Sequence, residues 1–528
     1  MARQDAPRLK AICVVIFFAC LQCVCTALAY ASSSEARAAA LGNTLPPSQQ
    51  ADLTAQEANL RELLHRAPND DIALARLGTV LAMQSKFEES AQCFEKALRV
   101  NPSDVESRRS LATDYWQLGQ SEKARTNLEI VLKAKPGDSL ATLLLGMVSE
   151  DLGDHQRAAK LLGDVLPLVR QRPETISALA RANYHIGDIE NARAALQMVT
   201  GPEAVFQGGR LAVEFKDYDT AEKMFLSIQN IYPDAGALNY NLALAQFSAK
   251  RYEPCERTLL ASINYGHGTP DTYALLGWAY AKQQRADEML KAFEKAINMA
   301  PSNESYFVDL GEALMENQKD PTALEVAKEA VKRFPSSPQA YRLKGSVELK
   351  SYLLTDALQS YTKATELDPN NPRAALGLAL TLWNMDRNDD AAKSFEEGVR
   401  KFPQDAFFLM KYALFLLNAP GERDAAADAR IKEFLKKSEE LDASNSETHY
   451  QLGNLAIQEN KYDEALSELQ TAAKLDPDVA KVHLLLARVF RRTGHEDEAM
   501  KETQLHRKLK EKEDQNVDAT AAIGTRHP

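Results

Sequence analysis

Histidine is the residue type in this chain best suited to metal ligation or proton transfer, but its nine copies are scattered. No two of them have the spacing that puts a pair of metal ligands on one helix face. His495 is followed by three acidic residues, but this group falls in an expected turn between two helices, where polar residues are usual. Phosphate-binding glycine loops and Gly-x-Ser-x-Gly are absent. The sequence therefore predicts no enzyme, no metal site and no cofactor.

A hydrophobic pattern with a period of about 34 residues determines which elements position the remaining side chains. One copy comprises Leu276, Gly277, Tyr280, Met289, Phe293, Ala296 and Pro301. Spacings of three and four place these residues on the facing sides of two helices, with Gly277 and Met289 at their crossing. The proline ends the second helix, because proline has no amide hydrogen and disfavours a helical residue before it. Each copy of the pattern is thus a helix–turn–helix unit.

This pattern resembles that of tetratricopeptide repeat (TPR) proteins over roughly residues 51–513. The resemblance implies an all-α fold, a right-handed α-solenoid of about thirteen helix–turn–helix repeats. The thirteen units are expected to begin near Asp71, Val105, Ser139, Pro173, Pro202, Gly236, Pro270, Glu304, Pro338, Pro372, Ala406, Ser446 and Ala480. Residues 51–70 fit a lone capping helix before the solenoid of residues 71–513. The fourth and fifth units are closer together than the others, which predicts a bend near residues 200–209.

The first 29 residues have the pattern of a secretory signal. Arg3, Arg8 and Lys10 precede an uncharged run at residues 11–30 that ends in small residues. We expect cleavage near Ala29 or Ala31, which makes the protein periplasmic or secreted. The alternative is an uncleaved signal anchor, in which residues 11–30 make the only membrane contact.

Polar segments flank the repeats, and the overall charge excludes one class of partner. Residues 30–50 are predicted to form a polar linker, and residues 514–528, which lack apolar periodicity, a disordered tail. The formal net charge is -11. A nucleic-acid-binding protein needs a basic stripe, so we expect no nucleic acid partner. Cys93 and Cys255 fall on distant second helices and are predicted to stay unpaired as small apolar residues.

The resemblance also implies where a partner would bind. In TPR proteins the first helices line the concave face, and the positions one and four residues after the small Gly or Ala contact ligands. The candidate partner-binding residues at these positions are Trp116, Tyr184, Phe247, Trp278, Met315, Trp383, Arg181 and Arg210. Aromatic side chains favour binding of a partner segment, and the arginines suit acidic groups. The alternative is that the apolar members pack inside the solenoid and the arginines are simply solvated.

Together these features predict a non-catalytic scaffold outside the cytoplasm that binds segments of partner proteins through the concave face. The alternative is an accessory subunit of an envelope polysaccharide-synthesis or secretion complex, where TPR arrays are common.

Overall fold

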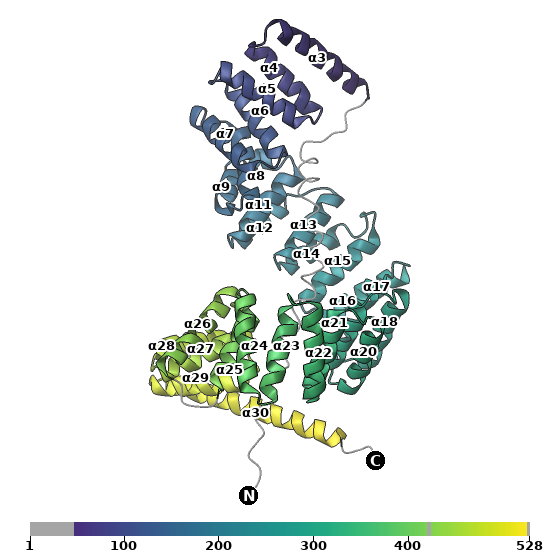
Figure 1. The fold of residues 1–528 in the computed structure, drawn as a ribbon, viewed down its shortest axis with the longest axis vertical. Coiled ribbons are helices and arrows are strands. Elements are labelled where there is room, and N and C mark those ends of the chain that lie inside the picture. The colour runs from purple at the N-terminus through teal and green to yellow at the C-terminus, as the bar shows by residue number, and fades with distance from the viewer. Residues whose placement is uncertain (1–46, 420–423, 525–528) are drawn as a thin grey trace. The chain divides into compact units, whose positions relative to one another are not determined.

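The computed structural model describes residues 47–419 and 424–524. The predicted signal segment at residues 1–29, its cleavage site and most of the linker lie outside the described residues. Within the described ranges every regular element is an α-helix, from α3 to α30 (Figure 1). The predicted all-α class is therefore confirmed.

Thirteen helix pairs follow α3 (Pro47–Arg66), as predicted. The first helices are α4 (Asp71–Met83), α6 (Val105–Gln117), α8 (Ser139–Asp151), α11 (Pro173–His185), α13 (Pro202–Glu214), α15 (Ala235–Ser248), α17 (Pro270–Lys282), α19 (Ser305–Glu316), α21 (Pro338–Lys350), α23 (Pro372–Asn384), α25 (Ala406–Leu417), α27 (Ser446–Gln458) and α29 (Ala480–Arg492). The second helices are α5 (Phe87–Val100), α7 (Ser121–Ala134), α9 (His155–Asp164) with the short α10 (Leu166–Val169), α12 (Ile189–Leu196), α14 (Tyr218–Ser227), α16 (Tyr252–Asn264), α18 (Ala286–Met299), α20 (Asp320–Arg333), α22 (Leu354–Leu367), α24 (Asn388–Lys401), α26 (Ala425–Leu441), α28 (Tyr462–Leu475) and α30 (Glu496–Gly524).

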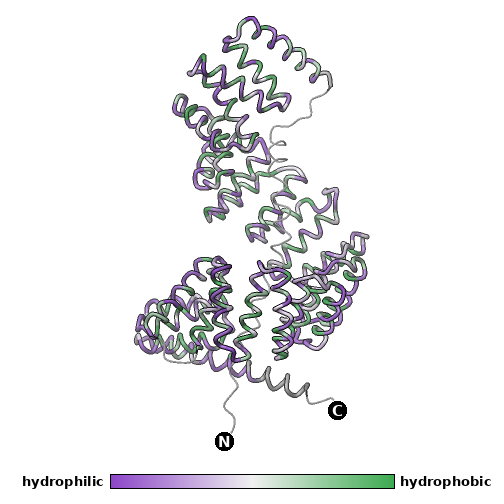
Figure 2. The backbone as a smooth tube through the Cα atoms, viewed as in Figure 1, coloured by the Kyte–Doolittle hydropathy of each residue, from purple (hydrophilic) through white to green (hydrophobic). Residues whose placement is uncertain are grey.

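The chain divides into two compact units, residues 1–299 and 300–528, and each is described by itself. Within each unit a second helix packs against the first helix of its own pair and, except for the short α12, against the first helix of the next. Successive first helices also contact one another, as α4, α6 and α8 do in one unit and α19, α21, α23 and α25 in the other. Hydrophobic and hydrophilic stretches alternate along the helices in Figure 2, as two packed layers require.

Local sequence explains where the first helices begin. Asp70, Asp104 and Asp138 each precede a first helix and accept hydrogen bonds from backbone N–H groups of its first turn. Such caps satisfy donors that the helix itself leaves free. In other pairs proline is the first helical residue, as at Pro270 and Pro338, where its missing N–H costs nothing.

In several repeats the small residue of the first helix is a glycine, required by an aromatic or leucine side chain from the second helix. A Cβ atom on Gly277 would lie 2.7 Å from the Phe293 ring, and one on Gly209 would lie 2.5 Å from the Phe225 ring. The nearest side chain to Gly277 is thus Phe293, four residues beyond the predicted Met289, which is also fully buried. Adding a methyl group at these glycines would force the two helices apart.

A short second helix accounts for the compressed fourth repeat. α12 spans only 8 residues, whereas α5, α7 and α18 span 14. The chain then turns through Gly201, whose φ of 89° is a left-handed conformation that favours glycine, directly into Pro202 of α13. The bend expected near residues 200–209 stays a prediction.

The two ends of the helical array extend further than expected. α3 begins at Pro47, inside the predicted linker of residues 30–50, and the described part of α30 reaches Gly524. The predicted disordered tail of residues 514–528 is therefore helical as far as residue 524. Three alanines at positions 519, 521 and 522 explain this, because alanine favours a helix even without an apolar face to bury.

Candidate functional site

Two of the predicted partner-binding side chains are used inside the solenoid. Trp116 is 5% exposed, and its indole N–H donates to Asp151 Oδ2 at 2.6 Å. Tyr184 is equally buried, and its hydroxyl donates to Asp217 Oδ2 at 3.0 Å. Its ring also stacks on Phe215, with 4.8 Å between the centroids. Because the polar atoms of both side chains already have partners, these residues hold neighbouring repeats together.

Phe247 and Met315 are also buried, at 5% and 8% exposure. The Phe247 ring meets the edge of Tyr252 on the following helix, with 5.4 Å between the centroids. Neither side chain offers the exposed surface that a partner needs. For these two residues, as for Trp116 and Tyr184, the arrangement is the packing alternative that the sequence left open.

Trp278 and Trp383 differ from these four because they remain partly exposed. Trp278 lies edge-on to Phe293 at 5.9 Å, and the Lys282 ammonium lies 5.8 Å from the indole. Trp383 lies edge-on to Phe415 at 5.6 Å. Each indole is therefore anchored by one aromatic neighbour and keeps part of its surface available.

Trp383 belongs to an apolar area on α23 and α25, which we call the Trp383 patch. Its members are the partly buried side chains Leu380, Trp383, Phe407 and Leu417. Trp383, Phe407 and Leu417 all pack against one buried cluster that includes Met410 and Leu414. The patch therefore has a rigid base.

A buried lysine borders the Trp383 patch. Lys411 is 8% exposed, and its ammonium lies 5.0 Å from the centroid of the Phe407 ring. Burial lowers the pKa of Lys411, and the negative charge of Glu447 only partly opposes this shift. The patch thus combines apolar surface with a poorly solvated cation.

The two arginine candidates lie near the surface. Arg181 is partly exposed, whereas Arg210 is exposed and donates from Nη1 to Gln207 Oε1 at 3.3 Å. Their use by a partner stays a prediction.

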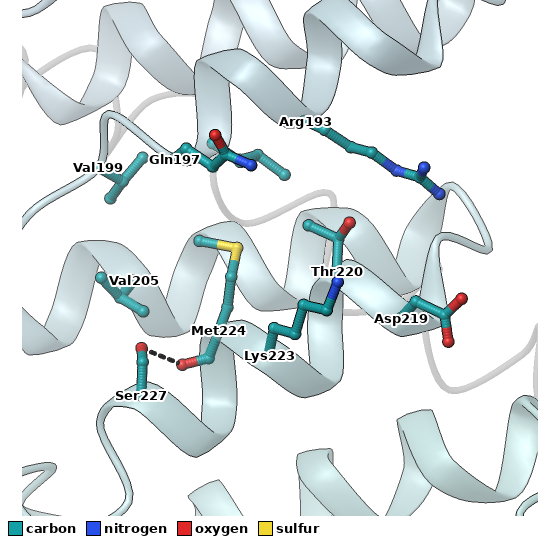
Figure 3. A pocket seen from close by; sticks show the side chains of 10 residues that line it. Arg193, Gln197, Val199, Val205, Asp219, Thr220, Lys223, Met224 and Ser227 are labelled. Atoms are coloured by element: carbon teal, nitrogen blue, oxygen red, sulfur yellow. Dashed lines mark hydrogen bonds between the residues drawn. The ribbon is translucent and has the colours of Figure 1, made fainter.

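A hollow of about 310 Å³ lies beside the short helix α12, between it and α14 (Figure 3). Arg193 on its rim is occupied by a bidentate ion pair with Asp217, at 2.8 Å from Nε to Oδ2 and 3.0 Å from Nη2 to Oδ1. Burial raises the pKa of Asp217, but the hydrogen bonds from Arg193, Thr220 and Tyr184 outweigh it, so the pKa lies below its usual value. The hollow is therefore bordered by a structural ion pair, and its floor is lined by apolar side chains such as Val199 and Met224.

Two histidines that lie far apart in the sequence are in contact in the third and fourth repeats. The rings of His155 and His185 stack with 3.8 Å between centroids and 12° between planes. His155 Nδ1 lies 2.8 Å from Oε2 of Glu150, which is buried. Burial, and then the charge of His155, lower the pKa of His185. The sequence analysis did not foresee this pairing, because it considered spacing along one helix only; its expectation that the histidines bind no metal stays a prediction.

Two other histidines form a repeated pairing in the last two repeats. His449 Nδ1 lies 2.8 Å from Glu468 Oε2, and its Nε2 lies 3.0 Å from the carbonyl oxygen of Ala443. His483 makes the same two contacts one repeat later, with Glu502 at 2.6 Å and the Pro477 carbonyl at 2.9 Å. Since oxygen atoms face both nitrogens of each ring, neither ring can bind another ligand without giving up one of these contacts.

Sequence models described as Tetratricopeptide repeat match residues 109–173, 270–303, 308–372, 349–413, 422–489 and 456–519. These matches together cover more than half of the chain. The chain belongs to the tetratricopeptide repeat family.

Two curated proteins are similar to parts of this chain. Cellulose synthase operon protein C of Pseudomonas fluorescens is 23% identical over 287 residues, which is 49% of this chain and 22% of that protein. BBSome complex member BBS4 of Bos taurus is 21% identical over 233 residues, covering 44% of this chain and 39% of that protein. Among solved structures, the crystal structure of yeast Tom70 aligns with a TM-score of 0.39 at 16% identity, over 86% of this chain and 96% of that chain. The chain therefore matches well under half of either curated relative's length.

The TPR register contained one signal that sequence reasoning missed. His449 and His483 occupy the same position of successive repeats, and so do Glu468 and Glu502. A side chain and its partner that recur together one repeat apart indicate a contact. The pairing of His155 with His185 leaves no such recurring pattern in the sequence, because it joins different positions of two repeats.

None of the helices in the described ranges has the length and apolar character needed to cross a bilayer.

Proposed function

We propose that this TPR protein acts outside the cytoplasm and binds extended segments of partner proteins along its first helices. TPR proteins are generally protein–protein interaction scaffolds, and the repeats occupy most of the described chain. The observation that carries the proposal is the Trp383 patch, a partly exposed apolar area on two neighbouring first helices.

The chemistry of the patch favours a particular kind of segment. Tryptophan and other aromatic side chains dominate binding energy when a partner covers them. The Lys411 ammonium at the edge has poor access to water, so a carboxylate of the partner would gain more from it than from a solvated lysine. We therefore expect apolar anchor residues followed closely by an acidic residue.

A second candidate function is that of an accessory subunit of an envelope polysaccharide-synthesis complex. The similarity to cellulose synthase operon protein C favours it. A predicted secretory signal agrees with this location. On this view the partner segments belong to membrane enzymes of polymer synthesis.

Site-specific photo-cross-linking in the native host tests the binding face without removing a buried side chain. A benzophenone amino acid replaces Trp383 on α23, and the matched control replaces Lys393, an exposed residue on α24 of the same repeat. Trp278 on α17 and Lys291 on α18 form a second matched pair. We expect protein adducts from the two tryptophan positions and few from the lysine positions. Equal adducts from both sets would contradict binding along the first helices.

Mass spectrometry of the adducts distinguishes the two candidate functions. Polysaccharide synthases among the adducts would favour the accessory subunit, whereas other envelope proteins would favour a more general scaffold. Intact mass of the mature protein tests export, with cleavage near Ala29 or Ala31 as the expected result. A full-length cytoplasmic protein would contradict the proposed location.

A further inference from the structure

We infer that Glu150, His155 and His185 form a binding site for a divalent transition-metal ion such as Zn²⁺. The three side chains come from the end of α8, the start of α9 and the end of α11. Each offers one ligand atom, and these atoms all lie within 4.8 Å of one another. Two imidazoles and one carboxylate are a ligand set that zinc accepts. This inference is independent of the proposed partner binding.

The donor atoms need only a small movement to close around an ion. Ligand atoms about 2.0 to 2.1 Å from a tetrahedral zinc lie roughly 3.4 Å from one another. The stacked rings of His155 and His185 must therefore turn from parallel toward convergent. His185 is exposed, and among the described residues its ring nitrogens have no hydrogen bond to break. Rotation of its side chain therefore breaks no hydrogen bond among the described residues, although it gives up the stacking on His155 and the edge-on contact with Phe215 at 4.8 Å.

The buried carboxylate of Glu150 is a second reason to expect a metal ion at this cluster. It is 8% exposed, and its only ion pair among the described residues is with His155. A buried carboxylate normally needs a cationic partner, and the His155 ring is the one group paired with it among the described residues. A divalent ion would neutralise the carboxylate. Of the other groups that act on His185, Glu214 adds negative charge and Arg181 adds positive charge, so they act in opposite directions.

A second cluster, made of one histidine and two glutamates, has a structural role instead. Glu439, His449 and Glu468 also hold their ligand atoms within 4.8 Å. There, however, the two ring nitrogens of His449 are already bonded to Glu468 and to the Ala443 carbonyl. A metal ion would have to displace one of these buried contacts. We therefore assign metal binding to the first cluster alone.

An ion at the first cluster would tie the third repeat to the fourth. Glu150 and His155 belong to one repeat and His185 to the next. With three protein ligands, zinc keeps a fourth position for water or for a donor atom of a partner. Because His185 is exposed, we expect that position to be accessible from solvent.

Cobalt(II) titration of the full chain without an affinity tag tests the site, since Co²⁺ takes zinc sites and its visible absorption reports coordination. The test variants are His155→Gln and His185→Gln, and the control is His65→Gln, an exposed histidine on α3. We expect one Co²⁺ per chain that Zn²⁺ displaces. Each test variant should weaken binding by more than about tenfold, a loss that even residues behind the ligands produce. The His65→Gln protein should bind as the unchanged chain does.

The titration has clear contrary outcomes. Absence of saturable binding at micromolar Co²⁺ and Zn²⁺, or binding that both test variants retain, would overturn the inference. Circular dichroism of His185→Gln, whose exposed ring makes no hydrogen bond among the described residues, separates lost binding from lost fold. Loss of Co²⁺ binding in His449→Gln but not in His185→Gln would place the ion at the other cluster and would also overturn it.

Discussion

The histidines of the third and fourth repeats and those of the last two repeats lie on similar helix pairs but in different chemical surroundings. His449 and His483 are buried, and oxygen acceptors face both nitrogens of each ring. His155 has one such contact, and His185 has none among the described residues. The comparison teaches that occupancy of the ring nitrogens, more than proximity to carboxylates, separates a structural histidine from one able to bind a ligand.

The largest expected effect is that of removing a structural histidine. His449→Leu leaves Glu468 buried, with only Lys436 as a nearby cation at 3.4 Å. Breaking one side of a buried ion pair costs about 3 kcal/mol or more, so the last repeats should unfold at lower denaturant. Hydrogen exchange of α27 to α30 measures the effect. Unchanged exchange in these helices would contradict the structural role of His449.

A buried carboxyl group without any cation provides the next test. Asp114 is 1% exposed, and burial raises its pKa to about 7, although a hydrogen bond with Ser90 opposes this. Ser90 Oγ lies 2.8 Å from the Gly78 carbonyl and 2.6 Å from Asp114 Oδ2. The single hydroxyl proton can serve only one of these two acceptors at a time, so Ser90 stabilises an ionised Asp114 only weakly. The structure thus pairs Glu468 with cations, whereas burial favours the neutral form of Asp114.

Asp114→Asn should therefore stabilise the first unit at pH 8. A carboxyl group with a raised pKa stabilises the folded state at acidic pH. This stabilisation is lost as the pH rises from the pKa of the unfolded chain, about 4, through the folded pKa of about 7. Asparagine does not ionise, so the variant should gain at least about 1 kcal/mol relative to the unchanged chain between pH 4 and pH 8. Urea unfolding at the two pH values measures this difference. The same pH dependence in both proteins would show that Asp114 is ionised when buried.

The pH dependence of His449 should be smaller but of known sign. The hydrogen bond with Glu468 raises the pKa of His449 despite its burial, and the Ala443 carbonyl adds to the shift. The stabilisation that His449 gives the folded state is thus complete at a pH below its pKa in the unfolded chain, about 6.5. It is lost as the pH rises through the higher pKa of the folded state. Glu468, whose pKa is lowered, stabilises the folded state at a pH above its unfolded pKa of about 4.5. This stabilisation is lost as the pH falls through the folded pKa. Of the other charges facing the pair, Glu439 favours the imidazolium, and Lys436 lies beside both carboxylates.

Hydrogen exchange of α27 and α28 should therefore be slowest near pH 5 to 6.5, after correction for intrinsic rates. His449→Gln should remove the loss of protection on the alkaline side. A variant that keeps this loss would assign it to another group.

The smallest effect is expected at the exposed histidine. His185→Leu makes the same change as His449→Leu, but it removes no hydrogen bond among the described residues. The free energy of unfolding should change by no more than about 0.5 kcal/mol, as is usual at a surface position. Thermal unfolding without added metal measures it. A loss as large as that of His449→Leu would contradict the distinction between the two regions.

Much of the fold is readable from the sequence because its determinants are local. Proline or a capping aspartate begins most first helices, so the expected starts agree with the structure to within one residue, as at Pro173, Pro270 and Ser305. The small residue at the helix crossing can also be found from the local sequence. Which side chain it meets, as Gly277 meets Phe293, depends on the orientation of that neighbouring ring.

The candidate site was less predictable because exposure depends on distant residues. Trp116 occupies a binding position in the family pattern, but Asp151 in the next repeat accepts its N–H and the ring is buried. Trp383 occupies the same position and stays partly exposed. His155 and His185 are 30 positions apart, and no rule of local spacing brings them together.

Long-range ¹H–¹⁵N spectra of histidine-labelled protein at pH 6, recorded with and without Zn²⁺, test the central claim most directly. These spectra report the protonation of both ring nitrogens for each residue. We expect His449 to be doubly protonated, and both His449 and His483 to be unaffected by zinc, whereas His155 and His185 shift on its addition. A zinc response at His449 or His483, or none at His155 and His185, would contradict the claim that nitrogen occupancy separates the two regions.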